Sequence, residues 1–378
     1  MRKRVLLMAS SMRGGGSERQ VLLLARHLDR ERFQPHLYLS DAVGDFLDQV
    51  PHDVPIHGYD AASQAPAVYV PGRALRRQAK YLRQVIRDAA IDVVYDRTFH
   101  MTLLAGSLAG NVRRVSTIVS PPDLALPMVE SRFVEIKRRR LAAAYRRSDQ
   151  VVAVSAQAAQ SAESYYGLPE GSVAIVRNPV DVDGLRDAAE AATTPNGDRT
   201  LLVCVGRMTA EKGHRDLIAA LPAVLRAWPH DRPPLQLRLI GDGPLRGEIL
   251  RQVESLRLSN HVRSVGAVAG AAAEIASADA LILPSRFEGM PNVVLEAMAL
   301  GTAVIATRAG GAVELQRDRA TAFWASPGDT DSIADAILRF ARQPELAEQH
   351  RLAAKDLIRQ EHDLRDVVRR IEDLLDPR

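Results

Sequence analysis

Short apolar runs alternate with longer amphipathic stretches along this 378-residue sequence, and this alternation constrains its fold more than any other feature. Each run is rich in Leu or β-branched residues and ends at a turn containing Gly, Pro, Asp or Ser. Apolar runs separated by helical patterns are typical of parallel strands covered on both faces, so the sequence predicts two doubly wound α/β domains. The twelve runs are Val5–Ala9, His36–Leu39, Val93–Tyr95, Val115–Val119, Val151–Val154, Val173–Val176, Leu201–Val205, Leu235–Ile240, Val262–Val265, Ala280–Leu283, Ala303–Ala306 and Ala322–Ala325.

The segment Asn178-Pro179-Val180-Asp181-Val182-Asp183 marks the predicted boundary between the two domains. We expect one α/β domain over residues 1–180, a second over 181–360 and a C-terminal helix over 361–378. Packing of that helix back onto the first domain is one alternative. The helix after the first strand is expected to be capped by Ser17 and to bury one stripe, formed by Val21, Leu24, Ala25 and Leu28.

The composition is that of an ordinary globular protein, with 46% hydrophobic and 25% charged residues. Cys204 is the single cysteine, so no intrachain disulfide can form. Aromatic residues make up only 4%, which argues against stacking platforms for nucleic acid. The apolar run behind the basic start is too short for a signal peptide, and no stretch is long enough to span a bilayer. We therefore expect a cytoplasmic protein.

The net charge of +4 is unevenly distributed. Residues 1–183 hold 25 Lys and Arg against 19 Asp and Glu, whereas residues 184–378 hold 25 against 27. The basic excess thus belongs to the first half. Only five of the fifty basic residues are Lys, so a Lys between glycines in a loop indicates a specific role.

Glycines follow the first predicted strand, at Gly14-Gly15-Gly16. Backbone N–H groups at such a helix start can approach an anion closely. The pattern does not match G-x-G-x-x-G, and no acidic residue closes a second strand, so binding of NAD is disfavoured. Two interpretations stay open for Gly15 and Gly16: contact with a ligand, or a tight turn alone.

A second loop, from Gly206 to His214, leaves the carboxyl end of the strand Leu201–Val205, where open α/β sheets bind ligands. It carries Arg207 and Lys212. Arg can fork across phosphate oxygens and Lys supplies a compact charge, so the pair suits a diphosphate. The alternative is a pair of solvated loop charges.

The most informative segment, residues 285–301, contains Glu288 in a loop and Glu296 in the helix that follows Pro291. Two carboxylates here read first as a general acid and base. They also suit the binding of sugar hydroxyls, because a carboxylate accepts two hydrogen bonds from a vicinal diol. Glu296 could instead be an exposed helix charge, although its neighbours are apolar and a buried carboxylate needs partners.

These segments resemble the retaining glycosyltransferases of family 4, which have the GT-B architecture of two Rossmann-like domains facing across a cleft. Glu288 and Glu296 match the E-x7-E motif of that family, within Phe-Glu-Gly-Met-Pro-Asn and Glu-Ala-Met-Ala-Leu-Gly. The other matches, in order, are Gly15-Gly16 with Glu18, Asn178-Pro179-Val180-Asp181, Gly206-Arg207 through Lys212-Gly213, Ile240-Gly241-Asp242-Gly243-Pro244 and Val-Ile-Ala-Thr at residues 304–307. The resemblance covers nearly the whole chain.

The resemblance implies a nucleotide-sugar donor held mainly by the second domain, with its diphosphate on Arg207 and Lys212. Glu288 would bind hydroxyls of the donor sugar, Glu296 the ribose diol, and the backbone near Val268 the base. Further donor contacts would come from Gly206, Gly289, Met290, Asn292 and Val293. The departing diphosphate would help deprotonate the acceptor hydroxyl, and the two cations would offset the charge on the leaving group. No metal site and no cofactor beyond the donor are implied.

One position departs from the pattern of the family, which often has a His-x-His pair after the strand near residue 94. The second of those histidines lies over the reacting sugar. This sequence has Tyr95-Asp96-Arg97, with His100 three residues later. By register Arg97 takes the place, where it could bind a donor phosphate or an anionic acceptor, and His100 could turn in from its loop or simply pack.

The acceptor side is expected in the basic first half. Cations recur at near-helical spacing over residues 73–87 and again at Lys137-Arg138-Arg139-Arg140. Arg138 should border the apolar stripe or project into the acceptor site, with Arg139 beside it, and Asp123 lies in a loop that could shape the acceptor pocket. Such helices suit an anionic acceptor or the anionic inner face of a membrane. A solvated surface in an Arg-rich chain is the alternative.

Together these features predict a retaining glycosyltransferase. It would transfer a hexose-type sugar from a nucleoside diphosphate to a hydroxyl of a glycan or lipid-linked acceptor, and the new bond would be an α-glycosidic one. The alternatives are a nucleotide-sugar-binding protein without transfer activity, and a nucleotide-sugar epimerase or a phosphorylase on the same fold. A pyridoxal-type phosphorylase is disfavoured because no candidate cofactor lysine stands apart.

Overall fold

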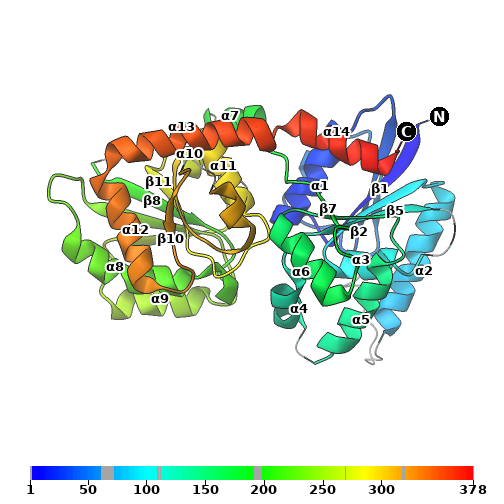
Figure 1. Ribbon diagram of the computed structural model, residues 1–378, viewed down its shortest axis with the longest axis horizontal. Coiled ribbons are helices and arrows are strands. Elements are labelled where there is room, and N and C mark those ends of the chain that lie inside the picture. The colour runs from blue at the N-terminus through cyan, green and yellow to red at the C-terminus, as the bar shows by residue number, and fades with distance from the viewer. Residues whose placement is uncertain are drawn as a thin grey trace. The chain divides into compact units, whose positions relative to one another are not determined.

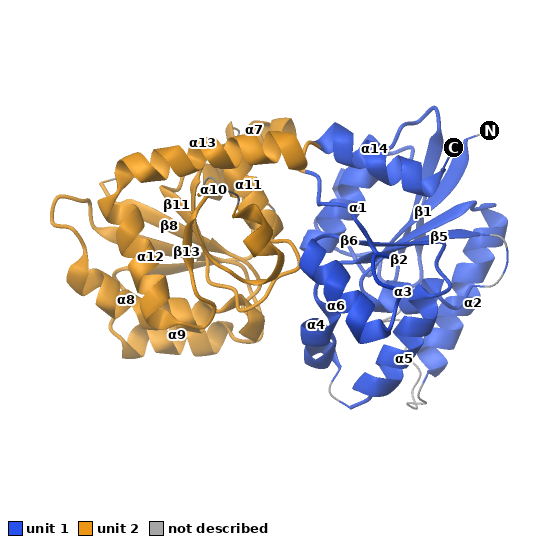
Figure 2. Cartoon of the chain, viewed as in Figure 1, with its two compact units in different colours: residues 1–179, 364–378 blue, residues 180–363 orange. Residues whose placement is uncertain are grey.

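The chain forms two compact units in a computed structural model. Unit 1 comprises residues 1–179 and 364–378, and unit 2 comprises residues 180–363 (Figure 2). The structure describes residues 2–60, 72–108, 110, 112–130, 132–190, 198–268, 270–316 and 320–377.

Unit 1 is built on a parallel sheet in the order β3-β2-β1-β4-β5-β6-β7. The strands are β1 (Lys3–Ala9), β2 (Phe33–Leu39), β3 (Ile56–Gly58), β4 (Val93–Arg97), β5 (Arg113–Ile118), β6 (Gln150–Ala153) and β7 (Ala174–Ile175). The six strands predicted in this half are present. The prediction lacked β3, because this three-residue edge strand has no apolar run and its Ile56 is exposed. The chain steps outward from β1 to β3 and then crosses to β4, so β1 and β4 form the switch point.

Helices cover both faces of this sheet (Figure 1). On one face α1 (Gly16–His27) and α14 (Leu364–Leu375) pack on odd-numbered residues of β1 and β4. The other face carries α2 (Arg73–Asp88), α3 (Phe99–Ala105), α5 (Val134–Tyr145) and α6 (Ala156–Tyr166), and α4 (Pro122–Val129) contacts α5 and α6.

Unit 2 has a second parallel sheet, in the order β10-β9-β8-β11-β12-β13. Its strands are β8 (Thr200–Val205), β9 (Leu235–Ile240), β10 (Val262–Gly266), β11 (Ala280–Leu283), β12 (Ala303–Thr307) and β13 (Phe323–Ala325). All six lie where the apolar runs predicted them. The switch point of this sheet lies between β8 and β11. The prediction of two doubly wound parallel sheets is therefore confirmed.

Helices also lie on both faces of the second sheet. One face carries α8 (His214–Ala227), α9 (Arg246–Ser255) and α12 (Thr330–Arg342). The other carries α7 (Val182–Glu190), α10 (Ala272–Ala276), α11 (Asn292–Leu300) and α13 (Pro344–Glu361). Short 3-10 turns occur at η1 (Leu47–Gln49), η2 (Ala210–Lys212) and η3 (Gly310–Leu315).

The start of α1 differs from its prediction in one respect. Its N-cap is Gly15, no side chain caps it, and Ser17 is the second residue of the helix rather than its cap. The helix therefore begins two residues earlier than it would with Ser17 as its cap. The predicted apolar stripe is confirmed, since Val21, Leu24, Ala25 and Leu28 are all buried.

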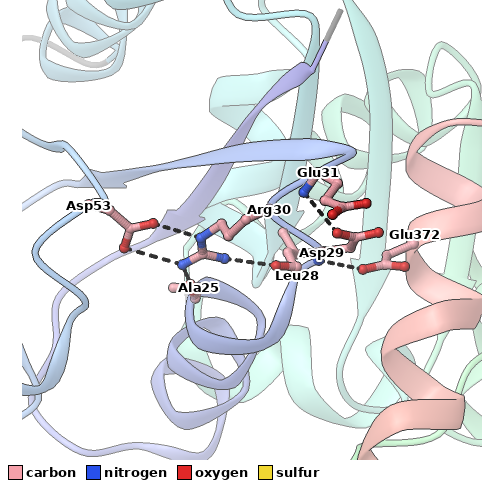
Figure 3. A network of polar contacts seen from close by, with 7 residues as sticks. All are labelled: Ala25, Leu28, Asp29, Arg30, Glu31, Asp53 and Glu372. Atoms are coloured by element: carbon pink, nitrogen blue, oxygen red, sulfur yellow. Dashed lines mark hydrogen bonds and ion pairs between the residues drawn. The ribbon is translucent and has the colours of Figure 1, made fainter.

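The C-terminal helix α14 is fastened to unit 1 at the amino ends of its strands. Glu372 of α14 accepts a hydrogen bond of 2.7 Å from the backbone N–H of Asp29 (Figure 3). Glu372 also lies 3.3 Å from a guanidinium nitrogen of Arg32. Next to it, Arg30 bridges Asp53 and the end of α1. A cavity of about 610 Å³ beside this contact is lined by charges of both signs. The cavity lies at the amino-terminal edge of this sheet, whereas Gly15, Gly16 and Arg97 lie at its carboxyl edge.

Candidate functional site

The candidate site in unit 2 is formed by loops that leave the carboxyl ends of neighbouring strands. The loop after β8 (206–213) and the loop after β11 (284–291) flank the switch point, where open α/β sheets bind ligands. The backbone N–H of Arg286 donates to the carbonyl of Glu211 at 2.7 Å, which ties these two loops together. The N–H of Gly206 donates to Ile240 at 2.9 Å, so the loop after β8 is also fixed to β9.

Lys212 and Glu288 meet at this switch point. The Lys212 Nζ donates to Glu288 Oε1 at 2.6 Å, and the Ser285 hydroxyl donates to the same oxygen at 2.7 Å. Ser285 is fully buried, and its carbonyl accepts a hydrogen bond from the Thr307 hydroxyl. Both charged side chains retain some exposure, so the carboxylate is held by a buried hydroxyl on one side and by an accessible cation on the other. The ammonium group of Lys212 can bind an anionic group, and the carboxylate of Glu288 beside it can accept hydrogen bonds from hydroxyls. The pair therefore suits a ligand that carries both kinds of group.

Two glycines let backbone segments pack closely against the loops that carry Lys212 and Glu288. Gly310 has a φ of +60°, and a β-carbon there would overlap the carbonyl of Glu288. The adjacent N–H of Gly311 donates to that same carbonyl at 3.2 Å. Gly213, with a φ of +66°, ends the loop of Lys212 against the carbonyl of Pro284. Both charged residues are therefore positioned by backbone that lies within contact distance of a neighbouring strand end.

Helix α11 begins immediately after the loop that carries Glu288. Pro291 is its N-cap, so Asn292 and Val293 supply the first N–H groups of the helix, while Gly289 and Met290 are buried just before it. Glu296, about one turn along the helix, is 8% exposed. The interpretation of Glu296 as a plain surface charge is therefore wrong.

The remaining predicted donor contacts are accessible. The Arg207 side chain is exposed and makes no hydrogen bond or ion pair within the ranges that the structure describes. Val268 follows β10 at the same edge of the sheet and is also exposed. Lys212 and Arg207 thus present two cations on one loop, one fixed by Glu288 and one extended into solvent.

Buried neutral groups surround Lys212. Burial and the charge of Lys212 lower the pKa of His214 to about 4, and burial raises the pKa of Cys204 to about 12. Both side chains are therefore uncharged at neutral pH. Because neither supplies a counter-charge, Glu288 is the carboxylate that balances Lys212.

In unit 1, Gly15 and Gly16 lie between the end of β1 and the start of α1. A β-carbon at Gly15 would overlap the carboxylate of Glu18, which folds back toward the helix start, and the Ser11 hydroxyl lies 3.5 Å from that carboxylate. Because that carboxylate is the end of a flexible side chain, this contact does not decide between a ligand contact and a tight turn at Gly15.

Arg97 ends β4 and is only 4% exposed. Its two terminal nitrogens donate to the Tyr95 hydroxyl at 3.2 Å and to Asn178 Oδ1 at 3.1 Å, both neutral acceptors. The neighbouring Asp96 points to the other face of the sheet, where Ser116 and Thr102 donate to it, and burial raises its pKa to about 6. Arg97 therefore holds the segment before Pro179, and no described carboxylate pairs with it.

His100 lies at the start of α3 and remains exposed to solvent. Its Nε2 lies 2.8 Å from Gln78 Oε1, and the amide nitrogen of Gln78 donates to the Ser40 hydroxyl at 2.6 Å. Because the amide oxygen must accept, Nε2 carries the proton and Nδ1 keeps its lone pair. Partial desolvation, with the nearby charge of Lys137, lowers the pKa of His100 below its usual value.

The predicted acceptor residues are engaged within unit 1. Arg138 forms two hydrogen bonds with Glu135, donates to the carbonyl of Tyr165 at 2.6 Å and lies over the Tyr165 ring. Arg138 therefore borders the apolar stripe, which was one of the two predicted positions, and its guanidinium is bonded to groups within unit 1. Arg139 bonds to Glu135 at 2.9 Å but is otherwise exposed. Asp123 accepts a hydrogen bond from the Ser161 hydroxyl.

The sequence predictions missed three side chains that position these groups. Ser285 and Thr307 support Glu288, and Gln78 fixes the tautomer of His100. Ser285 lies three residues before Glu288 and two after the end of β11, and this position is the sequence signal that could have indicated its contact with Glu288. Gln78 had none, because it contacts His100 only through the packing of α2 beside α3.

Within the described ranges, no group of three or more His, Cys, Asp or Glu side chains is placed to hold a metal ion. Nor does any helix in these ranges combine the length and the apolar character needed to cross a membrane.

Two protein-family models match successive parts of the chain. Residues 14–183 match the model described as Glycosyltransferase Family 4, and residues 199–343 match the model described as Glycosyl transferases group 1. The second match contains Arg207, Lys212, Glu288 and Glu296.

Relatives of similar sequence include glycogen synthase of Mycobacterium tuberculosis, 29% identical over 59% of this chain and 53% of that protein. Another is the GDP-mannose-dependent alpha-(1-6)-phosphatidylinositol monomannoside mannosyltransferase of Mycolicibacterium smegmatis, 33% identical over 37% of this chain and 38% of that protein. The chain thus matches about half or less of the length of these relatives.

Among solved structures, HepE of Anabaena in complex with UDP and glucose aligns with a TM-score of 0.78 at 22% identity, over 99% of both chains. This likeness concerns the fold. Together with the two parallel sheets, it confirms the expected GT-B class of two Rossmann-like domains.

Proposed function

We propose that this chain, which belongs to the glycosyltransferases with a family 4 domain followed by a group 1 domain, transfers a sugar from a nucleoside diphosphate to a hydroxyl group. The observation that carries the proposal is the contact of Lys212 with Glu288 at the switch point of unit 2. A cation for phosphate and a carboxylate for hydroxyls lie side by side there, which suits the diphosphate of a nucleotide sugar and the sugar bonded to it.

We assign the donor to the carboxyl edge of unit 2. Arg207 and Lys212 would contact the diphosphate, and the amide groups of Gly289, Met290, Asn292 and Val293 would contact its oxygens or the sugar. Glu288 would accept hydrogen bonds from sugar hydroxyls, which requires that Lys212 turns from the carboxylate toward the phosphate. Glu296 would hold the ribose diol, with Gly206 and Val268 beside the nucleoside. The burial of Glu296 and the exposure of Arg207 support this division.

In the proposed reaction the bond between the anomeric carbon and the diphosphate oxygen breaks as the acceptor oxygen bonds to that carbon. The acceptor hydroxyl loses its proton to the departing diphosphate on the same face, so the configuration is retained and an α-linkage forms. Arg207 and Lys212 stabilise the charge that grows on the leaving group. No metal and no cofactor are included in this scheme.

We assign further substrate contacts to unit 1. Gly15 and Gly16 offer backbone N–H groups, and His100 offers the lone pair of Nδ1 to a hydroxyl. Arg97 is buried beside Asn178, and we assign it a positioning role in unit 1 rather than contact with the diphosphate. A hexose-type donor and a glycan or lipid-linked acceptor agree with the names of the glycogen synthase and mannosyltransferase relatives.

The test is incubation of the full chain with UDP-, GDP- and ADP-sugars, with detection of free nucleoside diphosphate and of the transferred sugar. The proposal predicts that one donor is consumed and that a hydroxyl-bearing acceptor increases the rate. Binding without release of diphosphate would favour a nucleotide-sugar-binding protein, and conversion of the sugar while still attached would favour an epimerase. The absence of both binding and turnover with every donor would contradict the proposal.

A further inference from the structure

An arginine in the loop after β11 is bonded to the helix that follows the loop after β8. Arg286 lies two residues before Glu288, and its guanidinium donates two hydrogen bonds of 2.9 Å, from Nε and a terminal nitrogen, to the two carboxylate oxygens of Asp216. Asp216 belongs to the first turn of α8. A guanidinium that meets both oxygens of a carboxylate fixes the relative orientation of the two groups, which a single hydrogen bond does not.

The backbone of Arg286 contacts the same part of the chain. Its N–H donates to the carbonyl of Glu211 at 2.7 Å, and Glu211 directly precedes Lys212. Between these contacts, Gly213 packs against the carbonyl of Pro284. Arg286 is therefore bonded on both sides of Lys212: to the residue before it through the backbone, and to α8 beyond it through the side chain.

The two side chains of this pair differ in exposure. The side chain of Asp216 is 13% exposed, whereas that of Arg286 is 55% exposed. The carboxylate lies at the amino end of α8, where the free N–H groups of a helix favour a negative charge. Ion pairs with an exposed partner usually stabilise a protein little, so a paired contact between two loops of the candidate site indicates a local role rather than a contribution to overall stability.

The other charged contact between the two loops has to open in the proposed function. Lys212 bonds to Glu288 at 2.6 Å, and it must turn toward the diphosphate when a donor binds. Glu288 then accepts hydrogen bonds from the sugar instead. The bonds of Arg286 to Asp216 and Glu211 include neither of these residues, so they can persist when the contact of Lys212 with Glu288 opens.

We propose that Arg286 and Asp216 are positioning residues, which hold the loops after β8 and β11 together while Lys212 and Glu288 bind the donor. This inference rests on the proposed function. The pair keeps the cation and the carboxylate within reach of adjoining groups of one donor, the diphosphate and the sugar bonded to it. Displacement of a binding group by about 1 Å can slow a reaction substantially, so loss of the pair should lower the rate although neither side chain contacts the donor.

The test is a double-mutant cycle on the transfer reaction, measured with the full chain and the donor that the parent consumes. Arg286→Ala and Asp216→Asn should each lower kcat/KM about tenfold, and the double variant should also lose about tenfold rather than about a hundredfold, because either change breaks the same pair. Arg286→Lys keeps the charge but loses the paired hydrogen bonds, so it should recover only part of the rate. Asp335→Asn, in the exposed pair of Asp335 with Arg339 on α12, is the matched control and should keep the parent rate.

Hydrogen exchange tests the hold on the loops without any donor. The N–H groups of residues 206–213 and 284–291 should exchange faster in Arg286→Ala and Asp216→Asn than in the parent, and those of β8 should not. Exchange at the parent rate in both variants would overturn the proposal, as would a double variant whose loss of kcat/KM is the product of the single losses. A loss in Arg286→Ala with none in Asp216→Asn would also overturn it, by assigning Arg286 to direct contact with the donor. A parent without donor binding or turnover would contradict the proposed function, and the exchange rates would still decide whether the pair holds the loops.

Discussion

The two sheets have the same doubly wound order, but different kinds of side chain lie at their switch points. In unit 2 the loops after β8 and β11 bring Lys212 and Glu288 into contact at a partly exposed edge. In unit 1 the residue in the corresponding place, Arg97, is buried and donates to neutral groups. The same topology therefore places a partly exposed charged pair at the switch point of unit 2 and a buried arginine, bonded to neutral groups, at that of unit 1.

Net charge follows the same division. Unit 1 contains 29 Lys and Arg against 21 Asp and Glu, whereas unit 2 contains 21 against 25. In the proposed function, Arg207 and Lys212 are the local cations through which this slightly acidic unit would hold a diphosphate. The shared fold places the loops at the strand ends, and a few side chains on those loops set the charge of each edge.

The largest effect is expected from removing the charged pair of unit 2. Lys212→Ala should lower kcat/KM for transfer by about 100- to 1,000-fold, because a cation beside the leaving group acts mainly in the transition state. Glu288→Ala should cost a similar factor, through lost sugar contacts. Steady-state kinetics with the best donor measures both.

Surface variants of unit 2 control for this comparison. Glu248 pairs with Arg215 on an exposed face, so Glu248→Ala should keep the parent rate. If Lys212→Ala and Glu288→Ala retained both donor binding and turnover, the assignment of the site to this edge would be wrong.

The buried ionisable groups of the two units predict opposite pH effects on stability. The pKa of Asp96 in unit 1 is raised to about 6, so its contribution is present at low pH and is lost as the pH rises toward 6. The pKa of His214 in unit 2 is lowered to about 4, so its contribution is present above pH 6.5 and is lost as the pH falls toward 4. Each change amounts to about 3 kcal/mol at ~1.4 kcal/mol per pKa unit.

Urea unfolding between pH 4 and pH 7 separates these contributions. Asp96→Asn should make the free energy of unfolding rise more steeply with pH, and His214→Leu should make it rise less steeply. His230→Leu, at an exposed position, should leave the slope unchanged. A shift of the slope in the same direction for both buried variants would refute the opposite signs.

The smallest effect is expected from the hydroxyl that supports Glu288. Ser285→Ala removes one hydrogen bond to the carboxylate, worth about 1 kcal/mol, and should lower kcat/KM roughly fivefold while the fold is kept. Gln78→Ala in unit 1 removes the partner that fixes His100 and offers the parallel measurement. An effect of Ser285→Ala as large as that of Glu288→Ala would mean that the hydroxyl itself contacts substrate.

The strands and the parallel sheets could be predicted because buried parallel strands are apolar throughout, and periodicity reports this directly. The edge strand β3 could not be predicted from periodicity, because it is only three residues long and none of them is buried. The loops at the strand ends could be predicted from glycines and charges. The contact of Lys212 with Glu288 could not, because 76 residues separate them and only the placement of β8 beside β11 joins them.

Side-chain partners were the least predictable part. Spacing put Arg138 beside the apolar stripe, but its bonds to Glu135 and Tyr165 depend on the packing of α5 on α6. Arg97 carries a charge that suggests a ligand, and only the structure reveals its donation to Asn178. Sequence patterns report burial and turns well, whereas long-range hydrogen bonds follow from the assembled fold.

Calorimetric titration of nucleoside diphosphates tests the difference between the two edges most directly. UDP, GDP and ADP are titrated into the parent, Lys212→Ala, Arg97→Gln and the exposed control Arg359→Ala. The account predicts that one diphosphate binds the parent, that Lys212→Ala weakens its binding at least about tenfold, and that Arg97→Gln and the control weaken it far less. A larger loss for Arg97→Gln than for Lys212→Ala would contradict the assignment of the diphosphate to unit 2.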